Sequence, residues 1–239
     1  MITAASNSRI KRLVQLNQKS KLRRTEDVFL AEGVKMFLEA PREQLQEVYV
    51  SESFLEKCSC REHLEEVGYE VVSDSVFSKI SDTCTPQGVL CVLKQFHYNI
   101  EEMLRDKAPL FLLLENIQDP GNLGTMLRTG EGAGVSGIIM SRDTVDLYNP
   151  KVIRSTMGSI YRVPFYYADD FAAAVHQVQR AGVSVYAAHL RGKNSYACQD
   201  YTKGTAFLIG NEGNGLREET AELADCYIRI PMEGKVESL

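Results

Sequence analysis

Two polar clusters in the C-terminal half of the chain combine residue types and spacings that suit chemistry beside a phosphate. The first is ENIQDPGNLGTMLRTGEGAG, Glu115 to Gly134. Its Asp-Pro-Gly turn predicts the start of a helix near Asn122, which is well placed to cap it. Arg128 lies six residues further on, slightly under two helical turns, so it projects from near the same end of the sheet. An arginine there can bind a phosphate with two parallel hydrogen bonds, although a capped helix with a surface arginine is the simpler interpretation.

The second cluster is FLIGNEGNGLREE, Phe207 to Glu219, in which an apolar strand runs into a glycine-rich loop. Gly210, Gly213 and Gly215 allow positive φ angles and close approach of the backbone to a ligand. Glu212 is the acid inside this loop, at the carboxyl end of the predicted strand. The alternative is a strand-to-helix turn with a solvated glutamate. The closing segment, YIRIPMEGKVESL, indicates little by itself.

A glycine pattern at residues 132–137 resembles a dinucleotide-binding motif but has the wrong context. GAGVSG matches GxGxxG, yet it follows a predicted helix and precedes a predicted strand. The motif binds a pyrophosphate only where it follows a strand and opens a helix. These glycines are therefore expected to end the helix, and a nicotinamide-dependent oxidoreductase is disfavoured.

The elements that must position the two clusters alternate between strand and helix. Apolar stretches predict strands at 110–117, 137–141, 163–167, 183–189, 205–212 and 226–231, and helices at 122–132, 150–157, 170–180 and 215–223. Such alternation predicts an α/β domain with a mainly parallel sheet and helices on both of its faces. Ligands bind at the carboxyl ends of strands in such sheets, which is where both clusters lie.

The N-terminal part predicts a separate, smaller α/β domain. Strands are expected at 28–33, 45–51, 69–73 and 88–94, with helices at 34–40, 53–66 and 74–80. The predicted organisation is a basic helical arm at 1–27, a small α/β domain at 28–94, a linker at 95–108 and the larger α/β domain at 109–239.

The charge is distributed unevenly along the chain. The net charge is −5, but residues 1–24 contain no acid and the remainder has 20 basic against 32 acidic residues. A basic arm on an acidic body favours local contact with a polyanion, whereas the alternative is a solvated helix face. The cations predicted to bind RNA are Arg9, Lys11, Arg12, Lys19, Lys21, Arg23 and Arg24.

Composition excludes several other classes of protein. The longest apolar run, Leu110 to Leu114, is far too short to span a bilayer, and no signal-peptide core follows Met1. We therefore expect a cytoplasmic protein whose six cysteines are free thiols. Cys58, Cys60 and His63 have no second ligand pair at zinc-site spacing, so no metal is expected.

Taken in order, three motifs resemble the SpoU–TrmH family of RNA 2′-O-ribose methyltransferases, within the SPOUT superfamily. They are Asn122 with Gly124 and Arg128, the stretch Gly210-Asn211-Glu212-Gly213-Asn214-Gly215, and Ile230-Pro231-Met232 with Ser238-Leu239. The resemblance covers about residues 109–239. Residues 28–94 are similar to the small substrate-binding domain that precedes the catalytic domain in many members.

The resemblance implies a fold whose C-terminal tail is threaded into a trefoil knot, and a homodimer whose interface completes the active site. The chain stops at Leu239, where the family pattern continues with an asparagine and a final helix. We therefore expect a C-terminal end that is truncated relative to the family.

The resemblance also implies a set of functional residues. S-adenosylmethionine is expected between the loops that follow residues 189, 210 and 230, with no metal. The residues expected to bind it are Leu190, Gly210, Asn211, Gly215, Ile230, Met232 and Leu239. Arg128 is expected to stabilise developing charge, and Asn122, Glu212 and Ser238 to orient it and the ribose. Ribosomal RNA is the expected substrate; the alternatives are a transfer RNA methyltransferase and a non-catalytic RNA-binding protein.

Overall fold

The computed structural model describes residues 1–105 and 107–234, which form two compact units. The first unit contains Met1–Phe96 and Asp146–Tyr161, and the second contains His97–Val145 and the chain from Arg162 onward. The first unit is therefore discontinuous in sequence. It includes both the predicted basic arm and a segment that the sequence assigned to the C-terminal domain.

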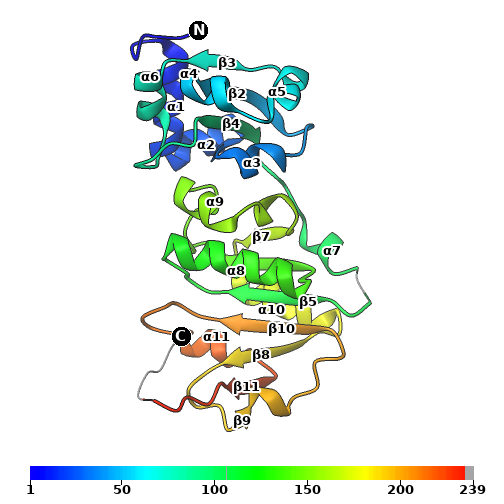
Figure 1. Cartoon of the computed structure of the whole chain (residues 1–239). Helices are drawn as coiled ribbons and strands as arrows, with labels where there is room; N and C mark the ends of the chain where they lie inside the picture. Colours follow the sequence, from blue (N-terminus) through cyan, green and yellow to red (C-terminus); the bar gives the residue numbers. More distant parts are fainter. Residues whose placement is uncertain (106, 235–239) are drawn as a thin grey trace. The chain divides into compact units, whose positions relative to one another are not determined.

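The first unit is built on a mixed sheet with strand order β1-β4-β2-β3 (Figure 1). The strands are β1 (Val28–Glu32), β2 (Leu45–Ser51), β3 (Glu70–Val72) and β4 (Val89–Lys94). β4 pairs antiparallel with β1 and β2, and β2 pairs parallel with β3. The connecting helices are α3 (Val34–Leu38), α4 (Glu52–Lys57), α5 (Arg61–Val67) and α6 (Asp74–Ile80). The single helix predicted at 53–66 is broken between α4 and α5, at a Cys-Ser-Cys stretch of weak helix formers.

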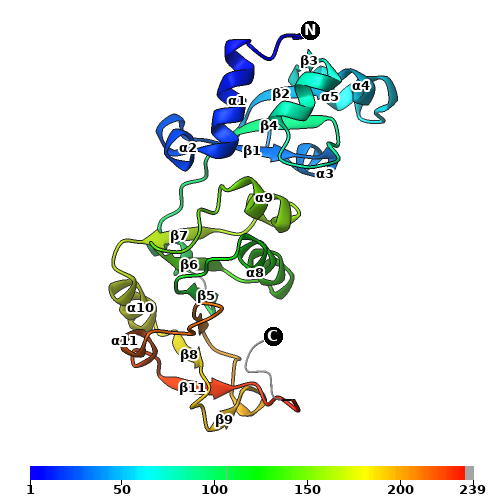
Figure 2. The same ribbon diagram turned by 90° about the vertical axis from the view of Figure 1, so that its left-hand side faces the viewer.

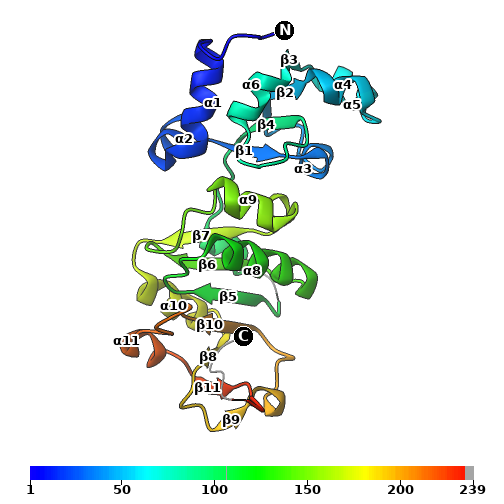
Figure 3. The same cartoon turned by 60° about the vertical axis from the view of Figure 1, so that its left-hand side comes forward.

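Two N-terminal helices, α1 (Ser8–Gln18) and α2 (Ser20–Glu26), belong to this unit (Figure 3). Ile10, Leu13 and Leu16 recur on one face of α1 and are fully buried. They share a core with Phe77 of α6 and Leu90 of β4. Because this apolar face needs the sheet to cover it, the basic helices form a layer of the small domain and not a separate arm.

The segment Asp146–Tyr161, which contains α9 (Pro150–Thr156), also packs within the first unit. The ring of Tyr148 lies 4.9 Å from that of Phe29 in β1. The hydroxyl of Tyr161 donates a hydrogen bond of 3.0 Å to the carbonyl of Met36. The predicted domain boundary at residue 109 therefore does not separate the two units.

The second unit contains a parallel sheet with strand order β7-β6-β5-β10-β8-β11-β9 among the described residues. Its strands are β5 (Leu110–Leu114), β6 (Gly137–Ser141), β7 (Phe165–Ala168), β8 (Ser184–Ala188), β9 (Asn194–Ser195), β10 (Thr205–Ile209) and β11 (Cys226–Arg229). Each neighbouring pair is parallel. This confirms the predicted fold class; only β9, which is two residues long, had no signal in the sequence.

Helices cover both faces of this sheet, as predicted. Figure 2 shows α8 (Pro120–Ala133) on one side, and α10 (Phe171–Arg180) and α11 (Glu218–Ala221) on the other. Val175 and Val178 of α10 share a core with Phe111 and Leu113 of β5. A short helix, α7 (Ile100–Met103), lies in the predicted linker.

The glycines at 132–137 end α8, as the sequence predicts. Gly134 is the C-cap of α8, with a left-handed backbone (φ 73°), and β6 begins three residues later at Gly137.

The expected knot and truncated tail depend on residues 235–239. These lie outside the described residues, so the knot remains a prediction.

Candidate active site

The predicted functional residues of the second unit follow strands whose carboxyl ends meet at one edge of the sheet. In Figure 1 the arrowheads of β5, β10 and β8 all point the same way. Asn122 follows β5, Glu212 follows β10 and Leu190 follows β8. Parallel strand order therefore gathers loops that are far apart in sequence.

The carboxylate of Glu212 joins the loop after β10 to the loop after β5. Its Oε1 accepts hydrogen bonds from the backbone N–H of Asp119 (3.0 Å) and from Nδ2 of Asn122 (3.3 Å). Its Oε2 accepts a hydrogen bond of 3.1 Å from the backbone N–H of Gln118. The two clusters identified in the sequence are thus in direct contact.

These hydrogen bonds favour the carboxylate form of Glu212. Partial desolvation alone would raise the pKa of its carboxyl group. The N–H donors of Asp119 and Gln118 and the amide of Asn122 outweigh that effect and lower the pKa below its usual value. Glu212 is therefore a carboxylate at neutral pH, able to accept hydrogen bonds and to orient the Asn122 amide.

Asp119, and not Asn122, caps α8. The Asp119 Oδ1 accepts a hydrogen bond of 2.8 Å from the Asn122 N–H, and Pro120 occupies the first helical turn. Proline suits the first position of a helix and aspartate suits the N-cap, so the helix starts earlier than predicted. Asn122 then lies inside the first turn, where its side chain can reach Glu212.

The glycine-rich loop after β10 is closed by its own backbone. Asn211 and Gly215 exchange N–H···O hydrogen bonds of 3.0 and 2.9 Å, and Gly215 has a positive φ of 69°. A Cβ at Gly210 would overlap the peptide between Gly215 and Leu216. The Nδ2 of Asn211 donates a hydrogen bond of 2.9 Å to the carbonyl of Asn116. Asn211 and Gly215, predicted to bind the cofactor, thus define the shape of this loop.

Arg128 lies exposed on α8. Among the described residues its side chain has no hydrogen bond or ion pair, and so none with Asn122 or Glu212. An exposed guanidinium without a carboxylate partner is available to bind a phosphate.

The residues predicted to bind the cofactor include exposed apolar side chains. Leu190, after β8, is 54% exposed and Ile230, after β11, is 49% exposed. These strands are neighbours, since Ala188 pairs with Ile228. Met232 is half-buried. Exposed apolar groups beside strand-end backbone suit a ligand that has an apolar purine face, so these residues fit S-adenosylmethionine. Ser238 and Leu239, also predicted here, lie outside the described residues.

The cations of the N-terminal helices fall into two groups. Arg9 pairs with Glu70 at 2.9 Å, and Arg12 pairs with Glu26 and Glu47 at 2.6 and 2.7 Å. The cations that are exposed and have no ion pair within the described parts of the chain are Lys11, Lys19, Lys21 and Arg24.

Arg23 was predicted to bind RNA, and this prediction is wrong. Its side chain is 4% exposed, pairs with Asp146 at 2.5 Å and donates a hydrogen bond of 2.6 Å to the carbonyl of Leu16. A buried arginine in this arrangement cannot reach a phosphate. Its partner lies 123 residues away in the sequence, so no local signal revealed it.

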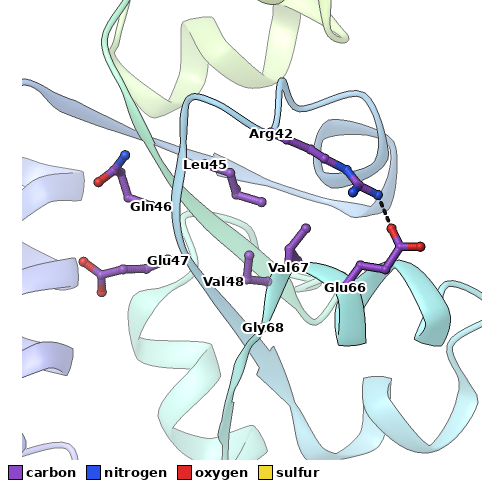
Figure 4. Close-up of a pocket in the computed structure, with 8 residues that line it drawn as sticks. All are labelled: Arg42, Leu45, Gln46, Glu47, Val48, Glu66, Val67 and Gly68. Atoms are coloured by element: carbon purple, nitrogen blue, oxygen red, sulfur yellow. Dashed lines mark hydrogen bonds and ion pairs between the residues drawn. The ribbon is translucent and has the colours of Figure 1, made fainter.

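The first unit has a separate hollow of about 210 Å³ (Figure 4). Leu45, Val48 and Val67 lie along it, and an ion pair between Arg42 and Glu66 bridges one side. None of the predicted site residues lines this hollow.

Within the described residues, no group of three or more His, Cys, Asp or Glu side chains is arranged so that it could hold a metal ion. Of the helices described here, none is both long and apolar enough to cross a membrane.

Comparison with known proteins decides the family. The model of the SpoU rRNA methylase family matches residues 109–239, and that of the MRM3-like substrate-binding domain matches residues 7–91. The chain belongs to the SpoU rRNA methylase family. As a member, it is an RNA 2′-O-methyltransferase that uses S-adenosylmethionine, which confirms the expectations for activity and cofactor.

Individual relatives of the family agree with this assignment. The chain is 31% identical to the 23S rRNA (guanosine(2553)-2′-O)-methyltransferase RlmP of Bacillus subtilis (strain 168), over 100% of this chain and 93% of the relative. It is 30% identical to the 23S rRNA (guanosine-2′-O-)-methyltransferase RlmB of Neisseria meningitidis serogroup B, over 67% and 66%. The structure of the AdoMet-bound rRNA methyltransferase from Sinorhizobium meliloti is 30% identical and superposes with a TM-score of 0.83, over 100% of this chain and 91% of that one.

Proposed function

We propose that this SpoU family member transfers the methyl group of S-adenosylmethionine to a ribose 2′-hydroxyl of ribosomal RNA. The observation that carries the proposal is the contact of Glu212 with the Gln118–Asn122 segment at the carboxyl edge of the parallel sheet. The names of the relatives, which act on 23S rRNA, support the choice of substrate.

The cofactor would lie against the loops after β8, β10 and β11. Leu190, Ile230 and Met232 would contact its apolar parts, and the backbone beside Gly210 would accept and donate hydrogen bonds. Asn211 and Gly215 would keep that backbone in place, and Leu239 is assigned to the same site by family resemblance. When bound, S-adenosylmethionine supplies an electrophilic methyl group.

Arg128 would bind the phosphate beside the target ribose and stabilise the negative charge that develops on the 2′-oxygen. A guanidinium remains protonated in proteins, so this role is electrostatic and positional, and not that of a base. Glu212 holds the amide of Asn122, which would orient the ribose together with Ser238. A fixed geometry of this kind lowers the entropic cost of reaction.

The exposed cations of α1 and α2 would contact the RNA backbone through Lys11, Lys19, Lys21 and Arg24. Arg9 and Arg12, which already have acidic partners, would contribute less. We further propose that the protein acts in the cytoplasm and as a homodimer.

Mapping of 2′-O-methyl groups across total RNA, from cells with and without this protein, tests the proposal. We expect one or a few positions in ribosomal RNA to lose their mark when the protein is absent. Loss of a mark in transfer RNA alone would contradict the choice of substrate. Purified full-length protein that neither binds S-adenosylmethionine nor changes any mark would overturn the catalytic assignment in favour of an RNA-binding protein.

A further inference from the structure

A buried carboxylate lies directly behind the loop that precedes Asn122. Glu115 follows β5 and is 1% exposed. Its Oε2 accepts a hydrogen bond of 2.9 Å from the backbone N–H of Arg217. Its Oε1 accepts hydrogen bonds from Nη1 of Arg217 (3.3 Å) and from Oγ1 of Thr220 (2.5 Å). A buried carboxylate is tolerated only when donors of this kind replace water.

Arg217 extends this cluster to the loop after β6. Its Nη2 forms an ion pair with Asp143. The Oγ of Ser141 donates a hydrogen bond of 2.5 Å to Asp143 and accepts one of 2.8 Å from the backbone N–H of Asn116. One guanidinium therefore connects the segments that follow β5, β6 and β10.

The charges of this cluster stabilise each other. The hydrogen bond to Asp143 raises the pKa of Arg217 above its usual value. Desolvation acts to raise the pKa of Asp143, but its hydrogen bonds to Ser141 and Arg217 outweigh this and lower it. Both groups are therefore charged across the neutral pH range.

The position of Arg217 in the sequence gives the cluster its significance. Arg217 comes immediately after the glycine-rich loop 210–216, which carries Glu212. At the other end of that loop, Glu115 N–H donates a hydrogen bond of 2.9 Å to the carbonyl of Ile209. Both ends of the loop that carries Glu212 are therefore held against Glu115.

We propose that Arg217 is a positioning residue for methyl transfer, acting through Glu115 and Asp143 to hold the Glu212 loop against the Gln118–Asn122 segment. The inference rests on the proposed function, because the chemistry that it supports is ribose methylation. Arginine is required because its planar fork can bind two carboxylates at once, whereas a lysine ammonium binds as a single point.

The test compares Arg217→Gln with Arg217→Lys and with Arg162→Gln in the full chain. Arg162 forms an exposed ion pair with Glu131 in the second unit. It precedes β7 and so lies at the amino end of that strand, not at the carboxyl ends where the site lies, which makes it a matched control. We expect Arg217→Gln to lower kcat for RNA methylation by up to about 100-fold, as loss of positioning does. The Kd for S-adenosylmethionine, measured by calorimetry, should change little. Arg217→Lys should recover part of kcat, and Arg162→Gln should match the wild type.

Hydrogen–deuterium exchange gives a readout that does not depend on activity. In Arg217→Gln the backbone amides of Gln118 and Asp119 should exchange faster, while the amides of β6 stay protected. If Arg217→Gln does not fold, Arg217→Lys and Thr220→Val, which removes one donor to Glu115, should show smaller changes of the same kind.

Normal kcat and unchanged exchange at Gln118 and Asp119 in the folded Arg217 variants would overturn the positioning role and leave the proposed function intact. A loss of kcat accompanied by an equal loss of cofactor affinity and no change in exchange would also overturn it. If the wild-type protein methylates no RNA, the proposed function fails. The exchange measurement then still decides whether Arg217 holds the loop.

Discussion

Two arginines that the sequence placed beside a phosphate, Arg23 in the N-terminal helices and Arg128 on α8, differ sharply in their surroundings. In the N-terminal helices, Arg23 is buried against Asp146 and stabilises the fold. On α8, Arg128 is exposed and has no ion pair among the described residues. A count of positive charge identifies candidates, but it does not separate structural from available cations. Burial and ion pairing in the folded chain make that separation, because only the folded chain shows which cations already have an acidic partner.

The substitution Arg128→Ala is expected to have the largest effect. Removal of the guanidinium should lower kcat for 2′-O-methylation by about 100-fold or more, because charge on the ribose oxygen is no longer stabilised. The affinity for S-adenosylmethionine, measured by calorimetry, should remain nearly intact, and Arg128→Lys should retain more activity than Arg128→Ala. Near-normal methylation by Arg128→Ala would show that Arg128 has no catalytic role, and the contrast with the structural Arg23 would no longer hold.

The substitution Arg23→Ala is expected to act on stability and not on catalysis. It leaves Asp146 and the Leu16 carbonyl without their partner, which should lower the free energy of unfolding by about 3 kcal/mol. Chemical denaturation measures this change, and Asp146→Asn should reproduce part of it. If Arg23→Ala instead weakened RNA binding at unchanged stability, the structural role of Arg23 would be refuted.

Substitution of the exposed cations should have smaller effects that are specific to RNA. Lys21→Ala and Arg24→Ala should each weaken RNA binding and reduce the slope of log K against log salt by about one. Neither should change the unfolding midpoint. A salt slope equal to that of the wild type in both variants would place the RNA on another surface.

The smallest effect concerns Glu212 and acid. Because its pKa is lowered in the folded protein, its contribution to stability is present above the ordinary glutamate pKa of about 4.3 and is lost as pH falls through the lower folded value. The difference in Tm between the wild type and Glu212→Gln should therefore be constant above about pH 5 and shrink below about pH 4. A difference in Tm that stays constant down to pH 3 would show that the ionised carboxylate of Glu212 does not contribute to stability.

The sequence predicts the parts of this molecule that depend on local pattern. The apolar run of β5 and the alternation of strands and helices are sufficient to predict a parallel sheet. That topology in turn predicts that Asn122 and Glu212 lie near each other, as they do. The start of α8 at Pro120 was predicted two residues too late, although an aspartate before a proline is the local signal for it.

Other features depend on partners that are distant in sequence, and local pattern does not reveal them. Arg23 and Asp146 are 123 residues apart, and Glu115 and Arg217 are 102 residues apart. Only the folded chain shows that these charges are neutralised. The composition of the first unit is another such feature. No local pattern in the sequence indicates that Asp146–Tyr161 packs with residues 1–96.

The discontinuity of the first unit has a consequence for synthesis on the ribosome. Nascent chains usually complete their N-terminal domain first. Here residues 1–96 emerge before Tyr148 can cover Phe29, before Tyr161 can reach the Met36 carbonyl, and before Asp146 can neutralise Arg23. The nascent domain therefore exposes an apolar surface until Tyr161 has left the exit tunnel. A gene fragment that encodes only residues 1–96 should yield a less stable and more aggregation-prone polypeptide than the full chain.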